Sequence, residues 1–371
     1  MERKMITILY LLTVLFFILS ASYKLKYLKR MQKVKDKKVS LIIPARNEED
    51  NIEEIINSAL AQNYKKENYE IIIVNDRSED KTQEIIEKYE EKSENLKLIN
   101  IKNKSDLLSG KQNALDIGIK KAKGEIILIT DADCILNKNW IKTIIRCFYS
   151  ENIGLVVGKT EITEEKRKNI LYKIQVMVHT ILLEFAQVPI MFGFYTSGMG
   201  NNLAFLRSGY FKIGGFEGLG DSILDDEILV RGFARSGYKI AAAFTKNATI
   251  QTKPMKTWKN MLKQHKRWIV GSLNIFTPSG LLALLFYFVN LYSIVLIFTN
   301  TYLFLFKLLG DYLLINYLDK KGKNILNIFD KILLSFLATF YLFFVETLAL
   351  VNPRTKWKNE KYKLKRKQGE M

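Results

Sequence analysis

The sequence predicts an α/β domain with a mostly parallel sheet, preceded and followed in the chain by transmembrane helices. Short apolar strands alternate with helical segments over residues 39–160, which is typical of a parallel sheet covered on both faces. Long apolar stretches lie near both ends of the chain, as in membrane proteins. Polar clusters follow several of the strands, at the edge where such sheets bind their ligands.

The composition excludes several classes of protein. With 371 residues, 48% of them hydrophobic, the chain is too long for a disulfide-dependent miniprotein and too apolar for a disordered one. Its only cysteines are Cys134 and Cys147, and its only histidines are His179 and His265. A disulfide framework, a cysteine-based zinc site and histidine-rich metal chemistry are therefore not expected.

The N-terminal stretch, residues 5–22, is almost purely apolar and has about the minimum length for a membrane span, about 18 residues. A cleaved signal peptide is the alternative interpretation. Eight lysines and arginines follow within residues 24–38, however, and such a cluster resists translocation. We therefore predict an uncleaved anchor with its basic flank over residues 1–38, followed by a cytoplasmic domain.

The first part of that domain alternates strand and helix. Residues 39–43 form a short apolar run that ends at Pro44, which predicts a strand. Residues 51–62 place apolar side chains at helical spacing. Residues 70–75 are a second run rich in β-branched side chains, closed by a polar turn.

The same alternation continues toward the middle of the chain. We expect helices over residues 82–91 and 111–121, and strands over 96–101 and 125–130. The last of these strands, EIILIT, has the continuous apolar character of a buried strand. Together these segments predict the sheet and helices of an α/β domain.

Two amphipathic stretches belong to the later part of the domain. Residues 170–194 are apolar enough either to touch a bilayer or to form a helix packed on the sheet. Residues 255–273 combine two tryptophans with several lysines, a mixture expected at a lipid headgroup surface. We expect both to be interfacial helices of a domain that spans residues 39–275.

Three further apolar stretches follow within residues 276–351, and a basic cytoplasmic tail closes the chain at 352–371. If the domain and the tail are both cytoplasmic, the C-terminal part must cross an even number of times. Residues 281–298 and 332–350 are the predicted crossings. Residues 302–318 contain two charged residues and are the weakest candidate for a span.

Most of the net charge of +19 lies beside these apolar stretches. The flank at 24–38 carries +7 and the tail at 352–371 carries +6. Clustered lysine and arginine beside apolar spans indicates cytoplasmic loops rather than a nucleic-acid groove. We therefore expect a multi-pass protein of the cell membrane with a cytoplasmic domain, and no nucleic-acid partner.

Polar clusters follow three of the predicted strands, at 44–48, 75–78 and 131–133. Asp131 and Asp133 alternate along the chain, so both can face one ligand. Carboxylate oxygens suit Mg²⁺ or Mn²⁺, which in turn bind phosphates. The glycine-rich patterns of dinucleotide-binding and P-loop sites are missing from the sequence. A solvated turn is the simpler explanation of an isolated Asp-x-Asp pair.

Eight motifs resemble, in content and order, those of the family 2 glycosyltransferases of membrane-bound type. The motifs are PARNE (44–48), VNDRS (74–78), GKQNAL (110–115), DAD (131–133), GNNLAF (200–205), GGF (214–216), LDDEILVRG (224–232) and QHKRW (264–268). The resemblance covers residues 39–270. It implies the GT-A fold, which is Rossmann-like, and inverting transfer of a sugar from a nucleotide diphosphate sugar with Mn²⁺ or Mg²⁺.

The resemblance also implies roles for individual residues. It makes Asp226 the catalytic base with Asp225 beside it, and Asp133 the metal ligand. It places Asp76 at the uracil imide, which favours UDP, and it gives Gln264, Arg267 and Trp268 the roles of the Gln-x-x-Arg-Trp motif at the acceptor and diphosphate. The remaining nucleotide-sugar contacts fall on Pro44, Arg46, Asn47, Glu48, Lys111, Asp131 and Ala132.

Two positions depart from the family pattern. The usual Asp-Asp-x-Ser begins here with Asn75, and Asp225 stands where glutamate is common. Neither change removes Asp133 or Asp226. Without the resemblance, the run from Asp225 to Glu227 would be interpreted as negative charge at a helix N-terminus.

The acceptor is predicted from the membrane segments. A site beside a bilayer favours a membrane lipid or isoprenoid acceptor. The alternative is a processive polysaccharide synthase, resembling hyaluronan or cellulose synthases, but few C-terminal spans are available to line a polymer channel. A basic nucleic-acid-binding or scaffold membrane protein is the alternative outside enzymes.

Overall fold

The computed structural model describes residues 36–108, 110–165, 168–195, 198–272, 278–321, 325–357 and 360–363. The predicted anchor at 5–22 and most of the basic tail lie outside these residues. Contacts divide the chain into two compact units. Among the described residues, the α/β unit comprises 36–163 and 185–253, and the helical unit comprises 164–184 and 254–363.

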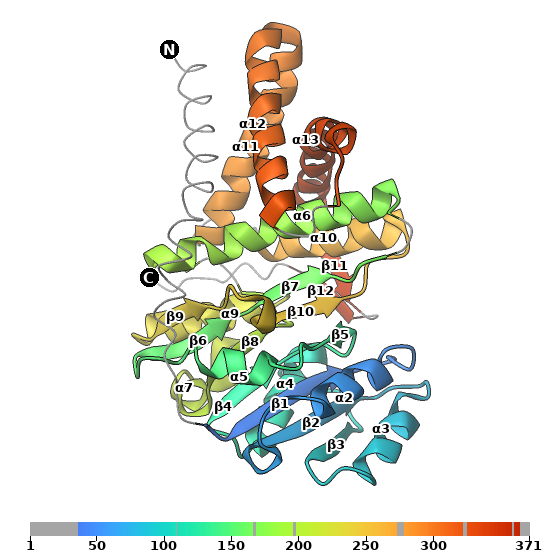
Figure 1. Cartoon of the computed structure of the whole chain (residues 1–371), viewed down its shortest axis with the longest axis vertical. Coiled ribbons are helices and arrows are strands. Elements are labelled where there is room, and N and C mark those ends of the chain that lie inside the picture. The colour runs from blue at the N-terminus through green and yellow to red at the C-terminus, as the bar shows by residue number, and fades with distance from the viewer. Residues whose placement is uncertain are drawn as a thin grey trace. The chain divides into compact units, whose positions relative to one another are not determined.

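A seven-stranded sheet forms the centre of the α/β unit (Figure 1), in the order β3-β2-β1-β4-β8-β6-β9. The strands are β1 (Val39–Ala45), β2 (Tyr69–Asp76), β3 (Leu96–Ile101), β4 (Ile126–Ile129), β6 (Ile153–Val157), β8 (Leu203–Leu206) and β9 (Lys239–Ala242). A second sheet has the order β5-β10-β7, with β5 (Cys134–Ile135), β7 (Lys159–Ile162) and β10 (Thr249–Thr252).

The central sheet is mostly parallel, as predicted. Strand β1 pairs in parallel with β2 and β4, β2 pairs in parallel with β3, and β6 does so with β9. Strand β8 is antiparallel to both of its neighbours, β4 and β6. The reversed β8 therefore separates the parallel strands of the N-terminal half from the β6–β9 pair.

Three helices of the α/β unit, α2, α3 and α4, lie at the positions that the apolar spacing predicts. Helix α2 buries Ile52, Ile55, Ile56 and Ala59, one stripe of an amphipathic helix. The helices and short 3₁₀ turns are α2 (Ile52–Leu60), η1 (Lys66–Asn68), α3 (Thr82–Glu90), α4 (Gly110–Lys121), α5 (Trp140–Ile145), η2 (Pro189–Phe192), α7 (Arg207–Lys212), α8 (Gly215–Leu219), α9 (Asp225–Arg235) and η3 (Lys246–Ala248).

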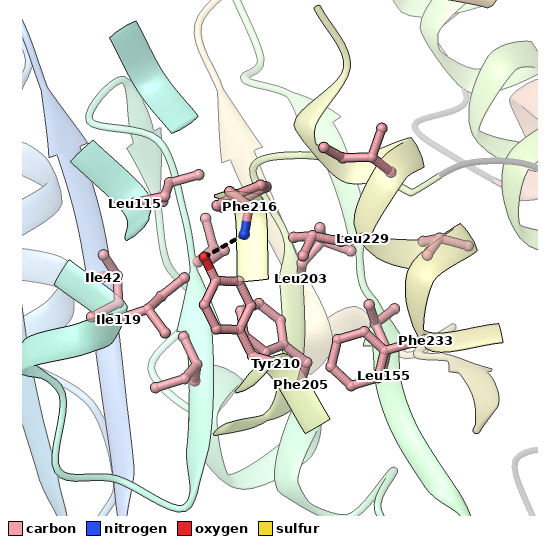
Figure 2. Close-up of a cluster of buried hydrophobic side chains, with 14 of the residues drawn as sticks. Ile42, Leu115, Ile119, Leu155, Leu203, Phe205, Tyr210, Phe216, Leu229 and Phe233 are labelled. Atoms are coloured by element: carbon pink, nitrogen blue, oxygen red, sulfur yellow. Dashed lines mark hydrogen bonds between the residues drawn. The ribbon is translucent and has the colours of Figure 1, made fainter. Parts of the chain in front are cut away.

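Both faces of the sheet are buried. Ile42, Val74 and Phe205 belong to a core cluster that also takes in side chains of α4 and α9, and Figure 2 shows part of it. Because successive strand residues point to opposite faces, Leu41 and Ile73, which are also fully buried, face the other side. This burial explains the continuous apolar runs of the strands.

A tyrosine joins three elements of that core cluster. The hydroxyl of Tyr210 donates to Asp116 on α4 at 2.6 Å and accepts from the backbone N–H of Phe216 at 3.0 Å, the bond dashed in Figure 2. Its ring stacks on Phe205 of β8 with the centroids 5.7 Å apart. Helix α4, whose first turn contains Lys111, is thereby held to α7 and α8.

The helical unit contains five long helices and a short hairpin within the described residues. They are α6 (Ile170–Gln187, whose last residues belong to the α/β unit), α10 (Trp258–Ser272), α11 (Pro278–Thr299), α12 (Thr301–Lys321), α13 (Ile328–Val351), β11 (Arg354–Trp357) and β12 (Glu360–Lys363). Helix α13 begins with a capping box, in which Asn327 and Asp330 each accept from the other's backbone N–H.

Among the described residues, one helix is long and apolar enough to cross a membrane, α13. Helix α11 contains a shorter apolar run, Ala283–Thr299. The stretch predicted as the weakest span, residues 302–318, lies within the continuous helix α12. The number of crossings stays a prediction.

Candidate active site

Three of the predicted polar clusters lie at the carboxyl ends of adjacent parallel strands. Residues 46–48 follow β1, Asp76 ends β2, and residues 131–133 follow β4. Because these strands are neighbours in the order β2-β1-β4, their carboxyl ends meet at one edge of the sheet. Pro44 fits in the central strand β1 because β4 pairs only as far as Ile42, so that no ladder bond to β4 is lost at that position.

Asp76 is a buried carboxylate between two arginines. Its oxygens lie 2.7 Å from Nε of Arg77 and 3.7 Å from Nη1 of Arg46. Arg77 and Asn47 both have positive φ, 54° and 52°, which is uncommon outside glycine and often marks functional turns. The arrangement presents an acceptor group flanked by donors at the sheet edge.

Hydrogen bonds lock the turns after β1 and β2 together. The backbone N–H of Asn47 donates to Ser78 Oγ at 3.0 Å, and the Asn47 side chain accepts from the N–H of Glu79 at 2.9 Å. The N–H of Glu48 donates to Thr82 Oγ1 at 2.8 Å. The polar groups of these two strand ends are therefore held in place before any ligand binds.

Lys111 lies at the centre of the acidic residues. Its Nζ is 2.7 Å from Asp131 Oδ1 and 3.3 Å from Asp225 Oδ2, and it donates to the carbonyl of Gly200 at 3.1 Å. Burial alone would lower the pKa of Lys111, but Asp131, Asp225 and Asp226 raise it above its usual value. The ammonium of Lys111 is therefore charged. It links Asp131, which follows β4, to Asp225, which begins α9.

Asp133 has the surroundings of a cation ligand. Burial, together with Asp131 and Glu48, raises the pKa of Asp133 to about 6. Such crowded carboxylate charge favours a cation. Within the part of the chain that the structure describes, no group of three or more His, Cys, Asp or Glu side chains is suited to hold a metal ion. Asp133 fits a cation that takes its other ligands from a phosphate-bearing substrate and water, as Mg²⁺ usually does.

The side chains of Ala132 and Cys134, on either side of Asp133, point away from solvent. Ala132 and Cys134 are buried, and burial raises the pKa of the Cys134 thiol well above its usual value. Cys134 is therefore an uncharged packing residue, and Asp131 and Asp133 are the polar groups of this turn.

Asp225 and Asp226 begin α9 and are both buried, at 9% and 8% exposure. Burial and then Asp225 raise the pKa of Asp226 to about 7, while Lys111 lowers it. A carboxylate with a pKa near neutrality is suited to general-base catalysis. Negative charge at a helix N-terminus does not by itself explain this burial, because a solvated side chain serves that purpose equally well.

Two site residues were not assigned a role from the sequence, although both lie in the motifs. Gly200 accepts from Lys111, and a Cβ there would lie 3.5 Å from the oxygens of Asp225. Gln112 accepts from the backbone N–H of Ser222 at 2.8 Å, three residues before Asp225. Position next to a predicted site residue was the only signal for either.

Gln264, Arg267 and Trp268 lie on α10, in the helical unit. The Trp268 ring stacks on His265 with centroids 5.2 Å apart, and His265 Nδ1 lies 2.5 Å from the hydroxyl of Tyr341 on α13. Burial lowers the pKa of His265 to about 4, so the imidazole is neutral. His265 thus joins α10 to α13, and the roles of the three motif residues stay predictions.

The mostly parallel sheet with acidic groups at its carboxyl edge defines the class of α/β domains of the GT-A type. A mannosyltransferase, PcManGT from Pyrobaculum calidifontis in complex with GDP-Man and Mn²⁺, shares this fold. It has a TM-score of 0.55 and 17% identity, covering 96% of this chain and 100% of that one. Residues 40–221 match the model of glycosyl transferase family 2, and the chain belongs to that family.

Curated relatives agree with this assignment. The probable glycosyltransferase YdaM of Bacillus subtilis is 30% identical over 240 residues, 63% of this chain and 55% of the relative. The glycosyltransferase AglE of Haloferax volcanii is 31% identical over 125 residues, 34% of this chain and 40% of the relative. The chain thus spans about half the length of these relatives or less. The predicted resemblance is confirmed.

Proposed function

We propose that the protein is an inverting glycosyltransferase that moves a hexose from a nucleotide diphosphate sugar, a UDP-sugar, to a membrane lipid or isoprenoid acceptor. The observation that carries the proposal is a cluster of three carboxylates around the ammonium group of one lysine. Lys111 lies between Asp131 and Asp225, and Asp226 beside them has a pKa raised to about 7 by burial and by Asp225.

The charged residues of this cluster have separate roles toward the sugar donor and the acceptor. In the proposed reaction the acceptor hydroxyl attacks the anomeric carbon as the bond to the diphosphate oxygen breaks. Asp226 takes the hydroxyl proton, and attack from the face opposite the leaving group inverts the anomeric centre. Lys111 supplies positive charge for the leaving diphosphate.

Asp133 would hold the divalent cation, Mn²⁺ or Mg²⁺. When bound, such an ion supplies a Lewis acid that stabilises the charge developing on the leaving diphosphate. Burial, then Asp131 and Glu48, raise the pKa of Asp133, and a cation would offset the repulsion among these carboxylates. Asp76, between Arg46 and Arg77, would accept from the uracil imide, and this contact is the basis for UDP.

The proposal includes a multi-pass protein with a cytoplasmic domain, and the side chains of the C-terminal helices support its membrane part. Large apolar side chains point outward, including Phe298 and Tyr302 at 84% and 87% exposure. Charged side chains of α12 and α13 are instead buried, as in the pair of Lys331 with Asp319 at 3.1 Å. Apolar groups outside and charges inside are expected of helices that face lipid.

A donor screen tests the proposal. Membranes containing the full chain are supplied with labelled UDP- and GDP-sugars and with Mn²⁺ or Mg²⁺, and extracted lipids are analysed by mass. We expect a single glycolipid that requires the ion and a UDP-sugar. Lack of transfer from every donor would overturn the enzyme assignment, and salt-sensitive binding of nucleic acid would favour a basic binding protein.

A polysaccharide synthase is the second candidate. The poly-β-1,6-N-acetyl-D-glucosamine synthase of Staphylococcus aureus is 33% identical over 146 residues, 39% of this chain and 33% of the relative. In the same screen, a product of high mass that stays with the membrane in place of a glycolipid would establish this alternative.

A further inference from the structure

The first turn of α4 holds the start of α9 at two points. Lys111 Nζ lies 3.3 Å from Asp225 Oδ2, and Gln112 Oε1 accepts from the backbone N–H of Ser222 at 2.8 Å. Two adjacent residues of α4 thus contact the segment 222–225 at its first and last residues. Lys111 also contacts Asp131 at 2.7 Å, so the same turn holds the carboxylate after β4.

The bond from Ser222 to Gln112 is made by the amide oxygen alone. Gln112 is 2% exposed, and its Nε2 has no hydrogen-bond partner among the described residues. Only an oxygen can accept from Ser222, so the orientation of the amide is determined by the backbone donor. A glutamate at this position could make the same bond.

The segment between α8 and α9 is partly exposed to solvent. Gly220 has a φ of 88°, Asp221 is exposed, and Ser222 and Ile223 are partly exposed. Ser222 Oγ accepts from the N–H of Leu224 at 3.2 Å, and Leu224 is the N-cap residue of α9. Fixing Ser222 therefore fixes the residue that starts the helix.

We propose that Gln112 is a positioning residue for the base Asp226, an inference that rests on the proposed function. Gln112 acts through Ser222 and Leu224, which set where the first turn of α9 begins. Lys111 contacts Asp131, and Gln112 acts on the segment that carries Asp226. Because both residues belong to the first turn of α4, they fix the position of Asp131 relative to the base Asp226. A displacement of the base by about 1 Å is enough to slow a reaction by about a hundredfold.

A Gln112→Met variant tests this role in the full-length protein. Methionine keeps the approximate length and volume of the side chain but accepts no strong hydrogen bond. We expect kcat to fall by about tenfold or more, while KM for the nucleotide sugar stays within about twofold, because the donor contacts are unchanged. Gln112→Glu keeps the acceptor oxygen and should restore kcat to within about threefold of the parent, measured on the plateau of the pH profile because the added charge raises the pKa of Asp226.

Gln62→Met is the matched control. Gln62 is also buried, at 7% exposure, and its Oε1 likewise accepts from a backbone N–H, that of Ile141 at 3.1 Å. The control also loses the bond from Gln62 Nε2 to the carbonyl of Asn137, so it should destabilise the fold at least as much. Its kcat per folded molecule, with folding measured by thermal unfolding, should stay within about twofold of the parent.

The outcomes separate this inference from the proposed function. Unchanged kcat in Gln112→Met, or an equal loss of kcat in both methionine variants, would overturn the positioning role while the parent remains an active transferase. If Gln112→Met fails to fold, Gln112→Glu decides, because a folded Glu variant with kcat far below the parent also contradicts the role. A parent without transfer would overturn the proposed function, and this inference with it.

Discussion

The ammonium of Lys111 lies 3.3 Å from Oδ2 of Asp225, which begins helix α9. The same ammonium lies 2.7 Å from Asp131 at the end of β4. A single cation therefore partly neutralises two acidic segments that are far apart in the chain. Burial and Asp225 raise the pKa of Asp226 to about 7, and the positive charge of Lys111 acts in the opposite direction.

Replacing the proposed base should stop transfer without unfolding the protein. Asp226→Asn keeps the shape of the side chain but cannot accept the acceptor's proton, so we expect kcat to fall by about 10²–10⁴-fold. The thermal unfolding temperature should change little or rise, because the substitution removes a buried charge. Asp221→Asn, an exposed position in the preceding segment, is the control. Full activity of Asp226→Asn would remove the assignment of the base.

The pH dependence of the parent follows from the raised pKa of Asp226. The base acts when it is deprotonated, so kcat/KM should be low below about pH 7 and rise to a plateau above it. An ordinary aspartate, with a pKa of about 4, would place this limb about three pH units lower. A profile that is flat from pH 5 to pH 8 would contradict this expectation.

Removing the positive charge of Lys111 should move that limb. Since Lys111 lowers the pKa of Asp226, Lys111→Met should raise this pKa and shift the acid limb to higher pH, besides weakening donor binding. Lys111→Arg keeps the charge and should leave the limb within a few tenths of a pH unit. The measurement is kcat/KM against pH for the three proteins, and a limb that does not move in Lys111→Met would show that the base is not coupled to the lysine.

Asp133 should be required for the effect of a divalent cation on stability. A ligand that binds the folded state alone stabilises it, by about 2.7 kcal/mol at a hundred times its Kd. We expect Mn²⁺ with UDP to raise the unfolding temperature of the parent but not that of Asp133→Ala. Asp36→Ala, which removes a carboxylate of the exposed pair with Lys65, should respond as the parent does. An equal rise in Asp133→Ala would place the ion elsewhere.

The positions of the acidic residues along the sheet edge could be predicted because they follow from strand order. A run such as EIILIT can only be a buried strand in this context, so Asp131 and Asp133 had to fall at its carboxyl end. The contacts across the site could not be predicted in the same way. The bond from Ser222 to Gln112 joins a backbone N–H to a side chain far away in the sequence, and such bonds leave no periodic pattern.

The reversed strand β8 shows a second limit of the sequence. Its residues LAFL have the same apolar character as the parallel strands, because β8 is also buried on both faces. Its direction depends on the path of the chain through η2 and the turn before Leu203, which apolar spacing does not encode. The sequence therefore predicted a mostly parallel sheet without identifying the antiparallel member.

The buried hydroxyl of Tyr210 should contribute measurably to the stability of the α/β unit. Tyr210 is fully buried, donates to Asp116 and accepts from the N–H of Phe216. Tyr210→Phe keeps the stacking on Phe205 but leaves the Phe216 N–H without its acceptor, which costs about 1–3 kcal/mol. Urea unfolding of the full chain in detergent measures this difference as a lower midpoint at unchanged slope.

Tyr238→Phe is the matched control, because the Tyr238 ring packs on Phe233 with centroids 5.5 Å apart. Both substitutions remove one hydroxyl from an aromatic pair, but only that of Tyr210 bridges α4 to the start of α8. The control should therefore change the free energy of unfolding by less than about 0.5 kcal/mol. Equal losses in the two variants would mean that the hydrogen bonds of Tyr210 add no net stability, and that the stacking of its ring alone holds α7 against β8.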